Sequence, residues 1–200
     1  MTATLDPTNY YWTLEEYYAL EKAGDRRYEY WDGEIVCMSG GTKEHGRIIA
    51  NVISLLANAL TNNNCVAFTE SQAVKAKVSD SGYVYPDASV ACHPAYERHE
   101  ERGIDLLINP VLIVEVTSKD SGIRDYNPKK EAYQAISSLN DYIIIEPDSR
   151  FITHYHRGVG GMGRTGGWSK HIYNEPDDII EFSNGSKFIL RDIYRGIEIG

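Results

Sequence analysis

The chain has 200 residues, of which 42% are hydrophobic and 24% are charged. These proportions are those of a globular domain with a real core, and they exclude wholesale disorder. The formal net charge is −9 at pH 7, whereas a typical nucleic-acid-binding domain is basic. A phosphate-bearing partner would therefore have to be held by a local basic surface or by metal ions.

Hydropathy and cysteine usage narrow the class of protein further. Apolar runs such as Val111–Val114 are far shorter than the ~20 residues of a membrane span, and residues 1–12 show no secretion signal. Cys37, Cys65 and Cys92 are few, odd in number and scattered, so we expect neither a disulfide framework nor a cysteine zinc site. Together these observations predict a reduced, soluble, cytoplasmic protein.

Helix signals occur in three segments. A capping box at residues 13–16 predicts a short helix over about Leu14–Lys22. Apolar residues recur at helical spacing from about Thr42 to Leu60. Asn127, followed by proline, predicts a third helix that ends near Leu139.

The remaining apolar segments have the pattern of strands. Asp32-Gly33 between two such segments is typical of a hairpin, and the continuous apolar character of Val111–Val116 indicates a strand covered on both faces. The charged character of residues 94–106 indicates a loop or a helical turn. The predicted strands are Tyr28–Trp31, Glu34–Met38, Cys65–Glu70, Ala73–Val78, Tyr83–Cys92, Val111–Val116, Tyr142–Glu146, Phe151–Arg157, Trp168–Tyr173 and a tail near Lys187–Leu190. This order predicts a mixed α/β sheet covered by helices, in one domain without repeats.

Two acidic residues are out of place on this sheet. Glu115 interrupts an apolar strand, where an ionised carboxylate costs several kcal/mol unless it is paired or bound to a metal. Asp87 follows Pro86 and points away from the apolar positions of its strand. Each also has an ordinary interpretation: Glu115 would lie near a strand end and reach water or a salt bridge, and Asp87 would belong to a Pro-Asp turn. Two acids facing one side of the sheet can nevertheless bind a hard divalent cation.

Lys129 is the third unusual residue. It continues the apolar stripe of its helix, with Ala132 and Tyr133, and it lies in the first turn, where its charge opposes the helix dipole. An anionic partner would offset both penalties. The alternative is a lysine whose charged end snorkels to solvent.

These residues belong to an ordered series of motifs. The series is Tyr28–Ile35, Ser39 with His45, Pro86-Asp87, Val114–Ser118, Asp125 with Lys129 and Tyr133, and Asp141–Ile145. In order and spacing it resembles the restriction-endonuclease-like family of uncharacterised bacterial proteins, which is placed in the PD-(D/E)XK nuclease superfamily. The match covers about residues 12–157, so we expect a single domain over residues 1–200 with a β-rich C-terminal extension from about 158 to 200.

The resemblance implies an α/β fold with a restriction-endonuclease-like mixed β-sheet core, flanked by helices and extended by β-hairpins. It also implies metal-dependent hydrolysis of DNA phosphodiester bonds by a homodimer. Carried over by position, Asp87, Glu115 and the Val116 carbonyl would bind Mg²⁺ or Mn²⁺, and Lys129 would be the motif lysine. Thr117 stands where the parent pattern has a lysine, and the family resembles superfamily members whose lysine has moved to the adjoining helix.

Two further positions match the family. Glu29, beside the Asp-Gly turn, would be an additional carboxylate at the site, or else an exposed strand acid. His45, in the first turn of the long helix, would bind a phosphate oxygen or orient a carboxylate, or else be structural.

The C-terminal part of the chain offers a basic segment. Residues 149–174 contain no Asp or Glu, and Arg157, Arg164 and Lys170 are candidates for contacts with the DNA backbone. A hairpin whose charge is incidental is the alternative. His154, His156 and His171 make a three-histidine metal site conceivable, but the sequence shows no acidic partner for it.

The leading hypothesis is an Mg²⁺-dependent endodeoxyribonuclease. The first alternative is a catalytically degenerate module of the same fold that binds DNA or protein, and the second is a metal-dependent hydrolase of another phosphate ester. The acidic balance and Thr117 favour the module, whereas the intact set of Asp87, Glu115 and Lys129 favours the nuclease.

Overall fold

The computed structural model describes residues 11–24, 26–31, 33–38, 40–61, 64–76, 82–99, 104–118, 125–159 and 165–199. The helices are α1 (Leu14–Ala23), α2 (Lys43–Ala59), α4 (Pro128–Gln134) and α5 (Leu190–Ile193). The strands are β1 (Tyr28–Trp31), β2 (Glu34–Cys37), β3 (Cys65–Thr69), β4 (Val74–Ala76), β5 (Gly82–Val84), β6 (Ala88–Cys92), β7 (Tyr96–His99), β8 (Ile104–Leu107), β9 (Leu112–Val116), β10 (Asp141–Glu146), β11 (Phe151–Val159), β12 (Thr165–Tyr173), β13 (Ile179–Glu181) and β14 (Lys187–Ile189).

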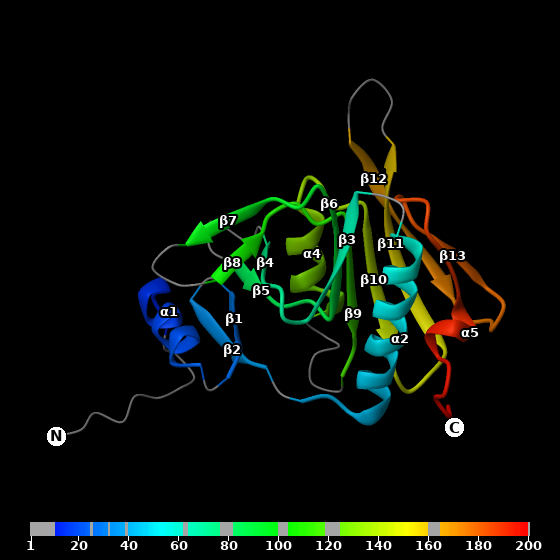
Figure 1. Cartoon of the computed structure of the whole chain (residues 1–200), viewed down its shortest axis with the longest axis horizontal. Coiled ribbons are helices and arrows are strands. Elements are labelled where there is room, and N and C mark those ends of the chain that lie inside the picture. The colour runs from blue at the N-terminus through cyan, green and yellow to red at the C-terminus, as the bar shows by residue number, and fades with distance from the viewer. Residues whose placement is uncertain are drawn as a thin grey trace.

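The strands form two six-stranded sheets and a small hairpin (Figure 1). The first sheet has the order β2-β1-β5-β4-β8-β7, the second the order β12-β11-β10-β9-β6-β3, and β13 pairs with β14. In the second sheet β9 and β10 are parallel, and α4 lies in the connection between them. The others of its strand pairs are antiparallel, so this is the mixed sheet that the sequence predicts.

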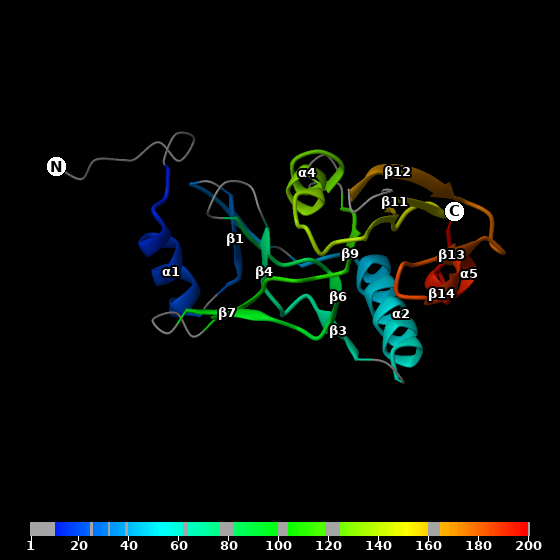
Figure 2. The ribbon, with the colours of Figure 1, turned by 90° about the horizontal axis from the view of Figure 1, so that it is seen from above.

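Helices cover both faces of the second sheet (Figure 2). On one face α2 packs with the C-terminal β13–β14 hairpin and α5, around a core that includes Ile48, Val114 and Ile143. On the other face α4 packs through Tyr133 and neighbouring residues, in a core shared with the first sheet. Because successive residues of a strand point to opposite faces, β9 contributes Val114 to the first core and places Glu115 on the α4 side.

The first sheet is covered on its outer side by α1. Thr13 and Glu16 form the reciprocal capping box that the sequence predicts, with Glu16 Oε2 accepting from the Thr13 amide at 2.8 Å. Tyr17 packs between Tyr30 and Tyr83 in a cluster of aromatic residues. This packing holds the β1–β2 hairpin, and with it Glu29, against the rest of the molecule.

Most predicted elements are confirmed with bounds that differ by a few residues, but three predictions are wrong. The segment Tyr83–Cys92 is two strands, since the chain leaves one sheet after β5 and enters the other at β6 around Pro86, which has no amide hydrogen for a ladder. In the charged segment 94–106, residues 96–99 form β7 and residues 104–106 begin β8; β7 is at the edge of its sheet, where charged side chains are compatible with a strand. The helix after Asn127 ends at Gln134, and Asn127 makes no capping side-chain bond.

The expectation of unpaired cysteines is also wrong. β3 and β6 are antiparallel and their register places Cys65 opposite Cys92, where the two form a disulfide. Residues far apart along the chain are brought together by strand pairing, which spacing alone does not reveal. Cys37 is free and exposed. None of the helices in the described part of the chain has the length and apolar character that crossing a bilayer requires.

Candidate active site

The site lies where β9 extends beyond its neighbour β6. Pairing between these strands ends at Ala88 and Val114, so the amide of Val116 has no partner in β6. The Asp87 carboxylate supplies one, since its Oδ2 accepts from the Val116 amide at 2.7 Å. This bond fixes Asp87 next to Glu115, although the two residues are distant in sequence.

Lys129 reaches the same place from α4. Its Nζ lies 3.0 Å from Glu115 Oε1, 3.0 Å from Glu29 Oε1 and 3.6 Å from Asp125 Oδ1. The lysine is 6% exposed and Glu115 is 4% exposed. The sequence prediction of a lysine on the buried stripe is therefore confirmed, and its anionic partners are carboxylates of the same chain.

Tyr133 holds Glu115 from the same helix. Its hydroxyl donates to Glu115 Oε1 at 2.7 Å, the oxygen that also accepts from Lys129. Lys129 and Tyr133 are four residues apart and so lie on one face of α4. The shared acceptor fixes the rotamer of Glu115, a role for Tyr133 that the sequence analysis had noted only as spacing.

Glu29 is a buried acid and not an exposed one. Its Oε1 accepts from the Tyr85 amide at 3.3 Å and its Oε2 from the Trp31 indole at 3.3 Å, in addition to its contact with Lys129. These bonds hold Glu29 in place on β1. The first sheet thus delivers a carboxylate to a site that is otherwise built on the second.

Negative charge exceeds positive charge in this cluster. Among the described residues, it contains the carboxylates Glu29, Asp87, Glu115 and Asp125 and the cation Lys129. Burial raises the pKa of Glu115 well above its ordinary value of 4.5, and Asp125, Asp87 and Glu29 raise it further, against the opposing effect of Lys129. Burial lowers the pKa of Lys129, but Glu115, Glu29 and Asp125 together hold it above its ordinary value.

His45 lies on the other side of Asp87. Thr42 caps α2 by accepting from the His45 amide at 3.2 Å, and the ring Nε2 is 3.5 Å from Asp87 Oδ2. Contact with Asp87 raises the pKa of His45, an effect that burial partly opposes and the Val116 carbonyl reinforces. His45 is therefore placed to orient Asp87 and to carry a positive charge beside it.

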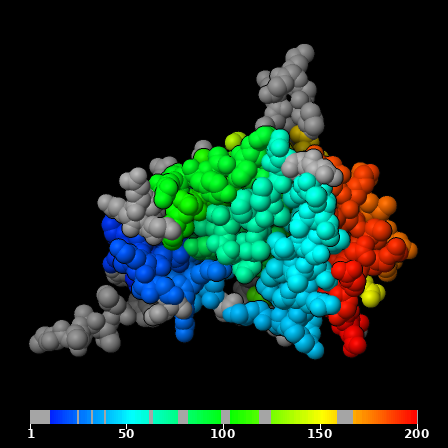
Figure 3. Space-filling model, viewed as in Figure 1, coloured from blue at the N-terminus to red at the C-terminus, as the bar shows by residue number. Residues whose placement is uncertain are grey.

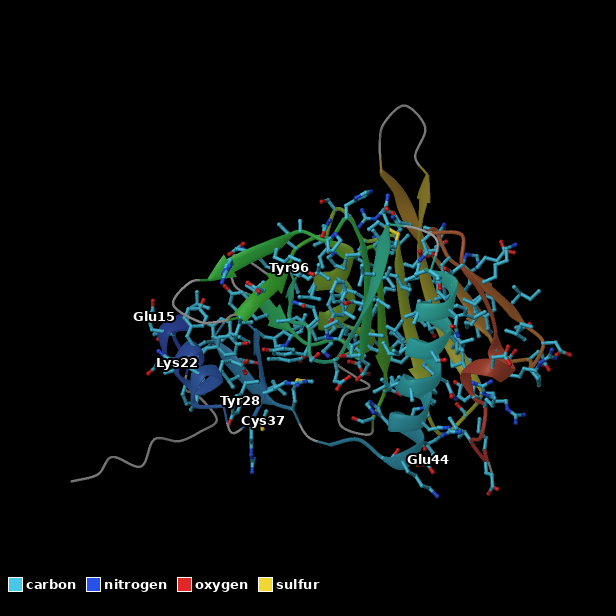
Figure 4. The ribbon with its side chains drawn as sticks, viewed as in Figure 1. Glu15, Lys22, Tyr28, Cys37, Glu44 and Tyr96 are labelled. Atoms are coloured by element: carbon cyan, nitrogen blue, oxygen red, sulfur yellow. A yellow bond between two sulfur atoms is a disulfide. The ribbon has the colours of Figure 1, made fainter. Side chains whose placement is uncertain are left out.

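All five predicted catalytic residues line one cavity of about 180 Å³. The segment between β2 and α2 contributes its wall through Met38, Gly40 and Gly41. Figure 4 labels Cys37 at the end of β2 and Glu44 in the first turn of α2, on the same side of the molecule. In the space-filling view the surface is hollowed between these two elements (Figure 3).

The donor set of this cavity fits a hard divalent cation. Mg²⁺ binds carboxylate and carbonyl oxygens, and Asp87, Glu115 and Val116 all line the cavity. A buried excess of carboxylates over cations is costly without a counter-charge, which a divalent ion would supply. The ammonium group of Lys129 supplies part of this positive charge, and its Nζ lies 3.0 Å from Glu115 Oε1.

Comparison with known proteins identifies the family. A family model described as "Uma2: Putative restriction endonuclease" matches residues 14–188. The chain belongs to the Uma2 family. Its membership confirms the restriction-endonuclease-like family that the motif series indicates.

Two cyanobacterial relatives are similar over most of the chain. The uncharacterised protein slr1290 of Synechocystis sp. (strain ATCC 27184 / PCC 6803 / Kazusa) is 30% identical over 183 residues, which cover 92% of this chain and 91% of slr1290. The uncharacterised protein sll1609 of the same organism is 28% identical over 146 residues, with 72% and 80% covered.

The fold of this Uma2 chain has a counterpart among solved structures. A crystal structure described as "a putative nuclease belonging to DUF820" from Anabaena variabilis ATCC 29413 superposes with a TM-score of 0.70 at 19% identity. The match covers 92% of this chain and 97% of the other. It confirms the predicted fold class, a restriction-endonuclease-like α/β fold.

Thr117 does not stand in for the lysine of the parent pattern. Its hydroxyl donates to Glu146 Oε2 at 2.8 Å, and Glu146 Oε1 accepts from Tyr126 at 2.9 Å. Thr117 thus belongs to a neighbouring hydrogen-bond network. The ammonium group next to Glu115 in this Uma2 protein comes from Lys129 on α4.

Arg157 and Lys170, two of the predicted DNA-contacting residues, do not line this cavity. Arg157 donates to the main-chain oxygens of Leu139, Gln134 and Ile136 at 2.7–2.9 Å, and its guanidinium stacks on Trp168 at 4.6 Å. Lys170 is exposed on β12. Arg164 lies outside the described residues.

Proposed function

We propose that this protein is a metal-dependent endonuclease that hydrolyses DNA phosphodiester bonds. The observation that carries the proposal is the convergence of Asp87, Glu115 and Lys129 in one cavity. These residues come from a loop, a strand and a helix, and the burial of more carboxylates than cations among them is costly without a bound counter-charge. Family membership supports the same activity.

Asp87, Glu115 and the Val116 carbonyl would hold Mg²⁺ or Mn²⁺. When bound, the ion would polarise the scissile phosphate and lower the pKa of a water molecule. The Asp87 and Glu115 carboxylates fix where the ion binds. Their own negative charge, which would otherwise repel a phosphate, is then neutralised.

Lys129 is the cationic residue of the proposed mechanism. Its ammonium group would orient the attacking water or stabilise negative charge that develops on the phosphate oxygens. Glu29 and Asp125 keep the lysine protonated, because both raise its pKa. Tyr133 positions Glu115, and His45 orients Asp87 and can donate to a phosphate oxygen.

A surface for the rest of the duplex would involve Lys170 and Arg164. Arg157 is part of the same proposal, although its guanidinium already binds main-chain oxygens. A homodimer would present two centres to the two strands of a duplex. The overall charge of −9 makes such a local surface necessary, and binding through it would weaken with salt.

A degenerate module of the same fold is the second candidate. Thr117 in place of a lysine favours it, and so does the pairing of Lys129 with carboxylates of its own chain. Such a module would bind DNA or protein without cutting it.

Plasmid cleavage separates the two candidates. Purified wild-type protein is incubated with supercoiled and linear DNA and Mg²⁺ or Mn²⁺, beside Asp87→Asn, Glu115→Gln and Lys129→Ala variants. If the protein is a nuclease, the rate of cleavage should fall by at least about 100-fold in each variant, as expected for loss of a group that acts on the transition state. Glu131→Gln, on the exposed side of α4, is the matched control and should cleave like wild type. Absence of cleavage with every substrate and ion would favour the module, and cleavage that survives in the variants would point to a contaminant.

A further inference from the structure

A second cluster of potential metal ligands lies on the second sheet, on the face opposite to the one that carries Glu115. β10 and β11 are antiparallel with Asp141 opposite His156 and Ile143 opposite His154. Since alternate residues share a face, this register places Asp141, His154 and His156 together, on the face where Ile143 and Ile152 meet α2 and the C-terminal hairpin. Asp141 is the acidic partner that the sequence analysis did not find for these histidines.

The three side chains converge on one carboxylate oxygen. Asp141 Oδ1 lies 2.8 Å from His154 Nε2 and 2.8 Å from His156 Nδ1. The three candidate ligand atoms are all within 4.8 Å of one another. Tetrahedral zinc, with bonds of about 2.0–2.1 Å, separates its ligands by about 3.3 Å, so an ion would require each distance from Asp141 Oδ1 to a histidine nitrogen to lengthen by about 0.5 Å.

The rest of the Asp141 carboxylate is held in place. Oδ2 accepts from the amide of Ser183 at 2.9 Å, which anchors the chain between β13 and β14 to the sheet. His154 is 2% exposed, and its Nδ1 is a buried atom with no hydrogen-bond partner in the part of the chain that the structure describes. His154 Nε2, which faces Asp141 Oδ1, is the nitrogen available to an ion, and Nδ1 would then carry the ring proton.

The cluster is open on one side. A cavity of about 240 Å³ is lined by His154, His156 and His171, with Phe182 and Tyr173 around them. The His156 side chain is 35% exposed, so an ion could enter without unfolding the hairpin. Three protein ligands and one open position are the arrangement of many zinc sites that also bind water.

We propose that Asp141, His154 and His156 form a binding site for a divalent transition metal, best met by Zn²⁺. Two imidazoles favour Zn²⁺ and its neighbours over Mg²⁺, which prefers oxygen. The site is distinct from the nuclease centre, because Asp141 pairs with Leu112 at the start of β9 whereas Glu115 lies near its end and faces α4. It does not depend on the proposed function.

Metal binding by the apo-protein tests this proposal. Untagged protein is titrated with Zn²⁺ by calorimetry and with Co²⁺ by visible absorption, since a four-coordinate nitrogen and oxygen site gives Co²⁺ an intense visible band and a six-coordinate oxygen site does not. We expect the intense Co²⁺ band in wild type, and one tightly bound Zn²⁺ per chain in the double variant Asp87→Asn/Glu115→Gln, which lacks the acids of the other centre. The Co²⁺ spectrum needs no variant and therefore does not depend on how a variant folds.

Variants locate the ion. In His156→Gln, at a partly exposed position, Zn²⁺ affinity should fall by on the order of 100-fold or more, since even outer-shell changes reach that size. The double variant Asp87→Asn/Glu115→Gln, which is altered only in the other centre, should keep the tight Zn²⁺ site and the intense Co²⁺ band. Absence of Zn²⁺ binding, a six-coordinate Co²⁺ spectrum, or binding that is unchanged in His156→Gln and lost in the double variant would overturn the proposal.

Discussion

Lys129 is buried among carboxylates, and this arrangement dominates the energetics at the scale of single residues. The lysine contacts Glu29 and Glu115 at 3.0 Å each. Truncating one partner of a buried ion pair is costly because the other charge is left uncompensated. Because the cluster holds more carboxylates than cations, the loss of Lys129 and the loss of Glu115 should have different effects. Without Lys129 the excess of negative charge grows, whereas without Glu115 it decreases.

Replacing Glu115 by glutamine should therefore stabilise the metal-free protein. The folded-state pKa of Glu115 is raised above its ordinary 4.5 by burial and by the acids around it, so the stability associated with its neutral form is lost as the pH rises through that raised value. The gain in Tm of Glu115→Gln over wild type, measured in EDTA, should accordingly grow as the pH rises from the ordinary pKa of 4.5 through the raised one. Thermal unfolding of both proteins measures it, and a lower Tm for the variant would contradict the account.

Removing the cation should have the opposite effect. Lys129→Met keeps the length of the side chain but leaves the carboxylates without a counter-charge, and it should cost about 3–5 kcal/mol of unfolding free energy. Lys130→Met is the matched control, because Lys130 lies over the Tyr155 ring and outside the cluster. Urea denaturation compares the two. Equal effects at positions 129 and 130 would show that the cluster carries no net negative charge.

At the scale of elements, α4 is a short helix with an unusual end. It has 7 residues, and the turn that follows it presents main-chain oxygens to Arg157 on β11. Arg157 thus ties the end of α4, which carries Lys129 and Tyr133, to the second sheet. A guanidinium at the carboxyl end of a helix also complements its dipole.

Loss of this arginine should destabilise the fold. Arg157→Ala should cost about 2–3 kcal/mol, the scale of hydrogen bonds that involve a charged group, whereas Lys170→Ala on the exposed face of β12 should cost less than about 0.5 kcal/mol. Chemical denaturation measures both. A negligible change at position 157 would favour the sequence-based interpretation of Arg157 as a residue retained for DNA contact.

The Cys65–Cys92 disulfide joins β3 to β6 across 27 residues of sequence. In the chain-entropy model a loop of this length is worth about 3.5 kcal/mol. Reduction should therefore lower the Tm of wild type and leave the double variant Cys65→Ala/Cys92→Ala unchanged. Differential scanning fluorimetry of both proteins, with and without reductant, measures the change. A wild-type Tm that is the same with and without reductant would contradict a stabilising role for the disulfide.

A helix or strand can be predicted from the sequence where its own residues carry the pattern that specifies it. The capping box before α1, the helical spacing of α2 and the apolar run of β9 are of this kind. The division of Tyr83–Cys92 between two sheets, the disulfide and the approach of Asp141 to His154 depend instead on strand order and register. These are properties of the packed chain, and no local pattern of residues encodes them.

At the scale of the whole molecule, the two sheets meet at the candidate active site. Asp87 lies in the connection from β5 to β6, Glu29 comes from the first sheet, and Glu115 comes from the second. The sequence identified the catalytic candidates because they are conspicuous where they occur: an acid in an apolar strand and a lysine on a buried stripe. Tyr133 was noted only for its spacing, because a tyrosine on an apolar helix face is equally suited to a core.

We propose that these side chains form a metal-dependent phosphodiesterase. The most direct test of this proposal is the rate of plasmid nicking by wild type and by Glu115→Gln in Mg²⁺, with the Tm of each recorded in parallel. We expect a variant that is at least as stable as wild type and slower by at least about 100-fold, so that unfolding cannot explain the loss. A stable variant that nicks DNA at the wild-type rate would contradict it.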